Sequence, residues 1–191
     1  MNRIILLMTL TVFWFALTSQ AQTNTKNTIY FGYSFIEADK FTGGNLSAKG
    51  YEIGYSRYIN DRFYGDISLG KFNFEGKGNV FFLEPEEMDY FNMSTFSLGL
   101  GYDFHQSERV ILSGELAYLR HTTHELLSEL TSQGVTIRET YNQVTHAPRL
   151  QLKARVFLTD NFQFVPAVAY GIRFRSQYTS YWLRAGLAYS F

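Results

Sequence analysis

The chain has 191 residues, of which 17 are lysine or arginine, 17 are aspartate or glutamate and none is cysteine. A net charge of zero with no basic run excludes nucleic acid as a partner, because such binding requires broad electrostatic attraction. The absence of cysteine excludes disulfides and a lipid anchor on an N-terminal cysteine.

The first 21 residues have the pattern of a secretory signal peptide. A basic Arg3 precedes an apolar run from Ile4 to Leu17, and small or polar residues ending in Ala21 follow. The apolar run is shorter than the roughly 20 residues that a membrane-spanning helix needs. We therefore predict cleavage of residues 1–21 and a single domain over residues 22–191.

The rest of the chain alternates apolar and polar residues in eight segments. Each segment is about as long as the roughly 9–11 residues with which a tilted strand crosses a bilayer. The pattern predicts an all-β fold, an eight-stranded antiparallel up-and-down transmembrane β-barrel. In chain order, the predicted strands cover residues 28–36, 49–59, 63–72, 94–104, 110–120, 148–158, 162–174 and 180–191.

The connections between these segments alternate in length, as in bacterial outer-membrane barrels. Short turns are expected at residues 60–62, 105–109 and 159–161. If the short side is periplasmic, an even number of strands places both termini there as well. Long loops are expected on the opposite side, at residues 37–48, 73–93, 121–147 and, somewhat shorter, 175–180.

Alternation alone fits either a membrane barrel with an apolar exterior or a soluble, lipocalin-like barrel with an apolar interior. The residues of the polar face distinguish the two kinds of barrel, because this face is rich in small residues such as Ser97, Gly99 and Gly101. Glycine weakens a strand, so a water-facing exterior has no reason to prefer it. Inside a narrow eight-stranded lumen, small residues make room for larger ones. We therefore expect the polar face to line the lumen.

The same face has several charged residues, and burying them unpaired would cost several kcal/mol each. We expect them to form an interlocked network that plugs the lumen. The predicted network consists of Glu52, Asp66, Glu115, Arg149, Lys153, Arg155, Arg173 and Arg184.

Two features of strand pairing are also predicted. If residues 132–134 form the tip between the fifth and sixth strands, Glu115 lies opposite Gln151, and the two strands extend beyond the membrane as a projecting hairpin. Pro166 lies inside the seventh strand and lacks an N–H for the ladder, so a bulge or irregular pairing is expected there.

The chain ends on an aromatic residue in a strand whose apolar face includes Tyr181, Leu187, Tyr189 and Phe191. With the signal peptide and the hairpin rhythm, this ending resembles the small porin-like eight-stranded outer-membrane β-barrel family of Gram-negative bacteria. The resemblance implies that these four residues form the signal read by the outer-membrane assembly machinery. It also implies a monomer surrounded by outer-membrane lipids.

The family includes lipid A deacylases, which use a histidine and a serine two residues apart together with a glutamate. His105 and Ser107 have this spacing, but they lie in a predicted periplasmic turn whereas Glu115 points into the lumen. Because a nucleophile and its base must converge, we expect no enzymatic activity. His121, His124 and His146 fall in one predicted loop without a zinc-motif spacing, so neither a metal nor a cofactor is expected.

The predicted loop 73–93 combines acidic and apolar residues. It is either a solvated extension of two strands or a recognition surface for an unknown partner. The favoured function is a non-enzymatic barrel whose exposed loops serve surface interaction or envelope integrity; the alternative is a narrow channel for ions or small solutes. The candidate recognition residues are Phe81, Phe82, Glu84, Glu86, Glu87, Asp89 and Tyr90.

Overall fold

The computed structural model describes residues 27–40, 44–75, 92–132, 135–172 and 178–191, with side chains except at 38–40, 44–46, 74–75, 125–132, 135–141 and 178. No helix among these residues is long and apolar enough to cross a membrane. The strands are β1 (Asn27–Lys40), β2 (Gly44–Tyr58), β3 (Phe63–Glu75), β4 (Asn92–Gln106), β5 (Val110–Ser132), β6 (Val135–Phe157), β7 (Phe162–Phe164), β8 (Ala167–Gly171) and β9 (Tyr178–Ser190).

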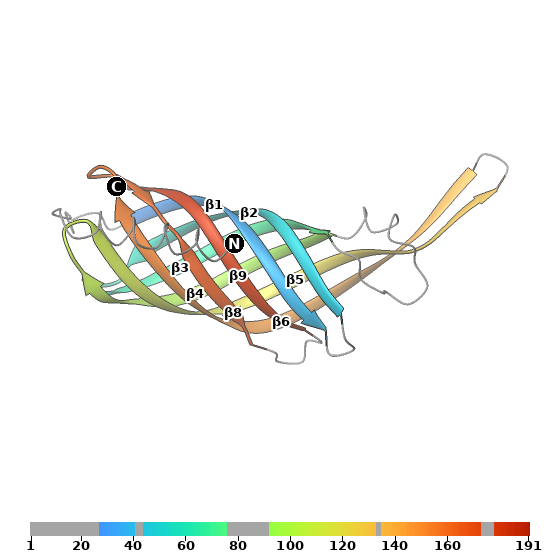
Figure 1. Ribbon diagram of the computed structural model, residues 1–191, viewed down its shortest axis with the longest axis horizontal. Helices are drawn as coiled ribbons and strands as arrows, with labels where there is room; N and C mark the ends of the chain where they lie inside the picture. The colour runs from blue at the N-terminus through green and yellow to red at the C-terminus, as the bar shows by residue number, and fades with distance from the viewer. Residues whose placement is uncertain (1–26, 41–43, 76–91, 133–134, 173–177) are drawn as a thin grey trace, which may run out of the picture.

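The strands form one closed antiparallel sheet (Figure 1). Each strand from β1 to β6 pairs with the next along the chain, and β9 pairs with β1 to close the ring. The short β7 and β8 occupy successive lengths of a single strand position between β6 and β9. The predicted eight-stranded up-and-down barrel is therefore confirmed.

Pro166 explains the division between β7 and β8. The register against β6 is the same on both sides of the break, since Phe164 faces Val156 and Ala167 faces Lys153. Of the two alternatives expected at Pro166, a bulge or an irregular pairing, the structure shows the irregular pairing. A missing N–H at position 166 interrupts the ladder without adding a residue to the strand.

The β5–β6 hairpin extends well beyond the other strands, as its predicted register implied (Figure 1). Most of the predicted loop 121–147 is therefore strand. The connections predicted at 37–48 and 73–93 are also shorter than predicted, since β1 runs to Lys40, β2 begins at Gly44, β3 runs to Glu75 and β4 begins at Asn92. These loops were overestimated because the apolar alternation stops at the ends of the aliphatic band whereas backbone pairing continues beyond it.

The predicted register of this hairpin is correct inside the barrel, where Glu115 faces Gln151. At the outer end Ser132 faces Val135, one residue away from the predicted pairing. A β-bulge between Leu126 and Ser128 compensates for the difference, so the pairs from Leu126 inward follow the predicted register.

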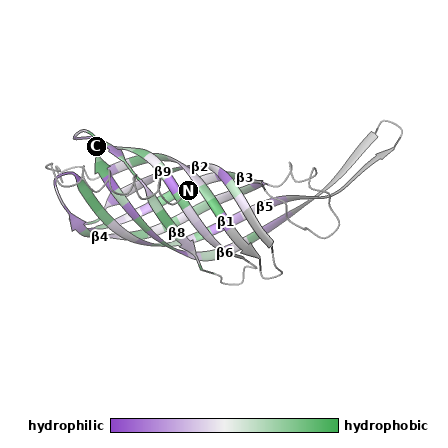
Figure 2. Ribbon diagram, in the orientation of Figure 1, coloured by the Kyte–Doolittle hydropathy of each residue, from purple (hydrophilic) through white to green (hydrophobic). Residues whose placement is uncertain are grey.

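Hydrophilic and hydrophobic residues both occur along each strand (Figure 2), and burial places the small and polar ones inside and the aliphatic ones outside. On β4, for example, Ser97 is 1% exposed and its neighbour Leu98 is 55% exposed. The lumen glycines make room for larger side chains, as predicted, but at two of them these are tyrosine rings, which were not predicted. A Cβ at Gly54 would lie 2.2 Å from Cζ of Tyr30, and one at Gly101 would lie 1.9 Å from Cζ of Tyr64.

The outer face separates aromatic from aliphatic residues along the strands. Phe63 and Tyr102 pack with tilted rings near the short turns, and Tyr170 and Tyr181 do so towards the opposite end. Aliphatic residues such as Leu98, Leu100 and Leu152 lie between these ends and are more than half exposed. Aromatic girdles around an aliphatic band are typical of transmembrane barrels.

Candidate functional site

The described part of the lumen contains four acidic and four basic side chains. Strands on opposite sides of the barrel contribute them, because alternate residues of β2, β3, β4, β5, β6 and β9 point inward. None is more than 6% exposed. The eight residues, which we call the lumen network, are Glu52, Asp66, Asp103, Glu115, Arg149, Lys153, Arg155 and Arg184.

Ion pairs connect most of the lumen network into one chain. Arg184 Nη1 lies 2.7 Å from Glu52 Oε1, and Arg149 Nη1 lies 3.6 Å from Glu52 Oε2. Arg149 also reaches Glu115, with 4.0 Å between Nη2 and Oε1. Glu52 and Glu115 therefore lie on either side of the Arg149 guanidinium, so their like charges are separated by a cation.

Lys153 is the central cation of the network. Its Nζ lies 2.9 Å from Glu115 Oε2 and 3.3 Å from Asp66 Oδ2. The ammonium also lies 4.4 Å from the ring centroid of Tyr64, while the hydroxyl of Tyr30 donates to Asp66 Oδ1 at 2.8 Å. Lys153 therefore has two carboxylates and an aromatic face as partners, which offsets the cost of removing its charge from water.

Arg155 and Asp103 form a separate pair nearer the short turns. Arg155 Nη2 donates to Asp103 Oδ1 at 2.6 Å, and Ser113 Oγ donates to the same oxygen at 2.8 Å. Tyr58 donates to the other carboxylate oxygen. Sequence reasoning omitted Asp103 from the network, although it lies on the same face of its strand as Ser97.

An apolar cluster covers the network at the end of the barrel nearer the projecting hairpin. Trp182 is its largest member, with Phe72 packed edge-on at 5.2 Å and the Arg149 guanidinium 5.4 Å from its ring centroid. Sequence reasoning missed this layer, although its residues continue the inward-facing alternation of the charged ones. We call it the apolar cover; its residues are Ile36, Ala48, Phe72, Met93, Leu119 and Trp182.

The space left between these layers is small. A cavity of about 10 Å³ lies among Ser34, Glu52, Arg149, Trp182 and Arg184. This volume is about the minimum that one water molecule requires. Paired charges, tyrosine rings and the apolar cover occupy the described part of the lumen, and the eight charged side chains are at most 6% exposed.

The three residues of the deacylase-like pattern are not brought together. His105 is exposed on β4, and Ser107 lies in the following turn, where its hydroxyl bonds to the backbone of Val110. Glu115 lies inside the barrel, paired with Lys153. A histidine outside the wall cannot act on a carboxylate or substrate inside it, so these residues have no catalytic geometry.

The three histidines near the hairpin base also lie apart. His121 packs in the lumen beside Trp182, with 6.1 Å between ring centroids. His146 is exposed on the outer face and bonds to the hydroxyl of Tyr118, while His124 bonds to Asn142. No group of three metal-ligating side chains occurs among the described residues.

The four residues of the predicted assembly signal share the outer face of β9. Their exposed fractions run from 43% for Tyr189 to 58% for Leu187. Phe191 continues this face beyond the end of the strand, and its backbone N–H donates to the carbonyl of Asn27 on β1 at 2.9 Å. The chain end is therefore part of the seam that closes the ring.

Several predicted residues lie outside the described part of the chain. One is Arg173 of the predicted lumen network. The others form the candidate recognition loop, namely Phe81, Phe82, Glu84, Glu86, Glu87, Asp89 and Tyr90.

Neither a protein-family model nor a curated protein matches the chain. Solved structures do match. Ail, the attachment invasion locus protein of Yersinia pestis, has a TM-score of 0.59 and 14% identity, covering 87% of this chain and 99% of its own. Neisserial surface protein A has a TM-score of 0.61 and 15% identity, covering 86% of this chain and 97% of its own. OprG from Pseudomonas aeruginosa has a TM-score of 0.56 and 13% identity, covering 91% of this chain and 99% of its own.

The chain has the fold of the small eight-stranded outer-membrane β-barrels. This outer-membrane barrel fold accounts for the arrangement of its two faces. In barrels of this fold an aliphatic band faces lipid, and charged residues are enclosed in a narrow interior.

Proposed function

We propose that the protein is a non-enzymatic outer-membrane protein with a closed lumen, which interacts with partners through its projecting β5–β6 hairpin. The observation that most supports this proposal is the filled lumen. Paired charges and an apolar cover leave no wide path through the described barrel, so interaction is expected at its outer surface. Residues 1–21 act as the cleaved export signal, and residues 22–191 form the barrel.

The alternative function is a narrow channel for ions or small solutes. A gap lined by glycine would favour it, but the lumen sides of Gly54 and Gly101 are covered by the rings of Tyr30 and Tyr64. A conducting path would also have to cross the apolar cover, where an unsolvated ion is unfavourable. The filled lumen therefore favours surface interaction.

The hairpin is suited to recognition because hydrogen bonds made by side chains hold its base and because its outer strand edges have no neighbouring strand among the described residues. At its base His124 Nδ1 lies 2.6 Å from Asn142 Oδ1, and Thr123 Oγ1 donates to the carbonyl of Gln143 at 3.3 Å. Within the described residues, β5 beyond His124 pairs only with β6. Unpaired strand edges can accept an extended segment of a partner through backbone hydrogen bonds.

The orientation in the envelope follows from the same proposal. The short turns and both chain termini lie on the periplasmic side, and the hairpin lies outside the cell. The assembly machinery recognises four residues on the outer face of β9 before the barrel is surrounded by lipid. These residues are Tyr181, Leu187, Tyr189 and Phe191. The protein functions as a monomer among outer-membrane lipids, since the closed ring leaves no sheet edge within the barrel for a second copy.

Removing the hairpin tests the proposal. A variant in which Asn-Gly replaces residues 126–140, joining the facing residues Glu125 and Tyr141, should keep the barrel and lose binding. Bacteria displaying the protein would be tested on immobilised matrix proteins and on a sulfated glycan. The glycan is included because Ail has been solved in complex with the heparin analogue sucrose octasulfate.

The matched control removes residues 79–90, the candidate recognition segment that precedes β4. Both variants should show the mobility shift between unheated and boiled samples that marks a folded barrel. Adherence that falls to background only in the hairpin variant supports the proposal. Adherence that is lost only in the control variant, or that is absent from the wild type, contradicts it.

A further inference from the structure

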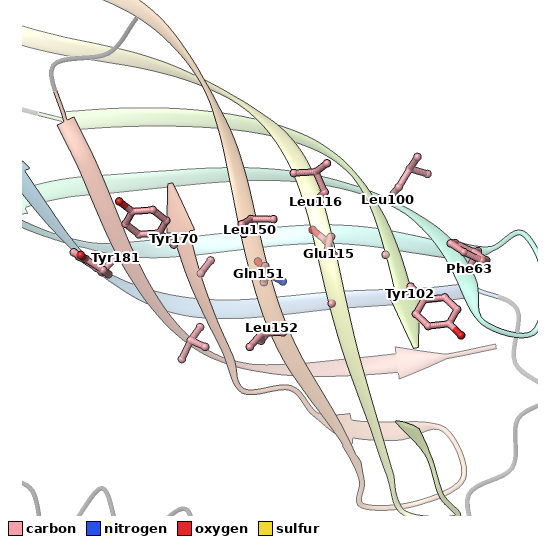
Figure 3. Close-up of a pocket in the computed structure, with 14 residues that line it drawn as sticks. Phe63, Leu100, Tyr102, Glu115, Leu116, Leu150, Gln151, Leu152, Tyr170 and Tyr181 are labelled. Atoms are coloured by element: carbon pink, nitrogen blue, oxygen red, sulfur yellow. The ribbon is translucent and has the colours of Figure 1, made fainter. Parts of the chain in front are cut away.

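A long groove crosses the outer wall of the barrel between two parallel rows of outward-facing side chains (Figure 3). The strand register defines the rows, because directly paired residues lie side by side on one face. The groove has a volume of about 770 Å³. One row consists of Leu100, Leu116, Leu150, Tyr170 and Tyr181; the other consists of Phe63, Tyr102, Gly114, Leu152 and Val168.

Gly114 opens the middle of the groove. A Cβ at this position would meet only Leu152 Cδ2, at 3.9 Å, so the absent side chain leaves real space. Aromatic pairs end the groove, with Tyr170 and Tyr181 at one end and Phe63 and Tyr102 at the other (Figure 3). The groove therefore runs obliquely from the short-turn end of the barrel towards the hairpin end.

A cation, Arg62, lies beside the short-turn end of the groove. The Arg62 guanidinium donates from Nη1 to the hydroxyl of Tyr102 at 3.3 Å, and Arg62 is exposed. The backbone of Arg62 is held on both sides, because its N–H donates to Asn60 Oδ1 at 2.9 Å and its carbonyl accepts from Asp103 at 2.9 Å. The remaining N–H groups of the guanidinium suit a phosphate at the membrane surface.

We propose that this groove binds one phospholipid, with an acyl chain between the two rows and the phosphate on Arg62. The groove crosses six neighbouring strands. Five inter-strand distances of about 4.8 Å each make it about 24 Å long. Half of a bilayer core is about 15 Å thick, so one acyl chain of a leaflet fits along the groove obliquely. The lipid belongs to the leaflet on the short-turn side.

A lipid suits the groove better than a second barrel does. The apolar lining lies in the band that the membrane surrounds, whereas the adjacent cation provides the polar end that a phospholipid requires. A second copy would present a convex barrel wall, which cannot enter a groove floored by Gly114. The acyl chain of a phospholipid thus matches the apolar lining of the groove, and its phosphate matches the positive charge of Arg62 beside the end of the groove.

The test is native mass spectrometry of the folded barrel, released from detergent micelles containing dioleoylphosphatidylglycerol or, in parallel, dioleoylglycerol. We expect the wild type to retain one phosphatidylglycerol. Gly114→Leu fills the groove and should weaken retention about tenfold, as the loss of contact with about two methylene groups implies. Arg62→Gln should weaken retention of the phospholipid about fivefold and leave that of dioleoylglycerol unchanged.

Ala185→Leu is the matched control, because Ala185 is an exposed residue of β9 that faces Tyr33 outside the groove. All variants would first be checked for folding by the mobility shift on boiling. Equal retention by Gly114→Leu and Ala185→Leu overturns the proposal. So does a dimer of barrels that replaces the lipid adduct and disappears in Gly114→Leu.

Discussion

Replacing Lys153 with methionine should lower the free energy of unfolding by about 3–5 kcal/mol, because breaking a buried ion pair from one side leaves uncompensated charge. Lys153 is the shared cation of Glu115 and Asp66, at 2.9 and 3.3 Å. Methionine keeps much of the side-chain volume, so the loss reports the charge rather than a cavity. Urea unfolding in lipid vesicles, followed by the fluorescence of Trp182, measures the difference.

Lys71→Met is the control for this prediction. Lys71 is an exposed lysine on β3, and its replacement should change stability by less than about 0.5 kcal/mol. If the two variants differ by under about 1 kcal/mol, the range of exposed ion pairs, Lys153 does not hold the network together.

Gly101→Ala should lower stability by about 1–3 kcal/mol, the cost of overpacking a filled interior. The added Cβ would lie 1.9 Å from Cζ of Tyr64, which is 1% exposed and packs against Lys153 and Arg155. The ring has to shift, and its contacts with both cations then weaken. The same unfolding assay measures the effect.

Two comparisons separate overpacking from a general effect of alanine. Gly65, on the adjacent strand β3, has open space where its Cβ would be, so Gly65→Ala should be neutral or slightly stabilising. In a Tyr64→Leu background the cost of Gly101→Ala should shrink, because the obstructing ring is gone. An equal loss in both backgrounds would contradict the steric explanation.

Much of the fold could be predicted because a closed barrel repeats one simple rule. Alternation at a period of two identifies each strand and its faces, and small residues opposite leucines show which face is inside. Strand ends could not be predicted in the same way. The register of the β5–β6 hairpin predicted its projection, but the ends of the other strands were not predicted, because outside the aliphatic band the composition no longer alternates while the backbone pairing continues. The compensating bulge at Leu126 has no signal of its own in the sequence.

The charged residues of the candidate site were visible as residues that a lipid-facing wall would not contain. Their partners were not, because ion pairs such as Arg184 with Glu52 join residues 132 positions apart. Asp103 was placed on the lumen face but left out of the network, because its position near a turn gave no sign that it would pair with Arg155. The apolar cover was missed because Trp182 and Leu119 are not distinguished by residue type from the lipid-facing residues of the same strands.

Planar-bilayer conductance of the wild-type protein tests the closed lumen most directly. The mobility shift on boiling would first establish that the inserted sample is a folded barrel. A variant combining Arg184→Ala with Trp182→Ala serves as the comparison, because it removes both a cation of the network and the largest residue of the apolar cover. We predict no steady conductance for the wild type and measurable openings for this variant. A steady wild-type current that scales with salt concentration would contradict the closed lumen and favour a channel.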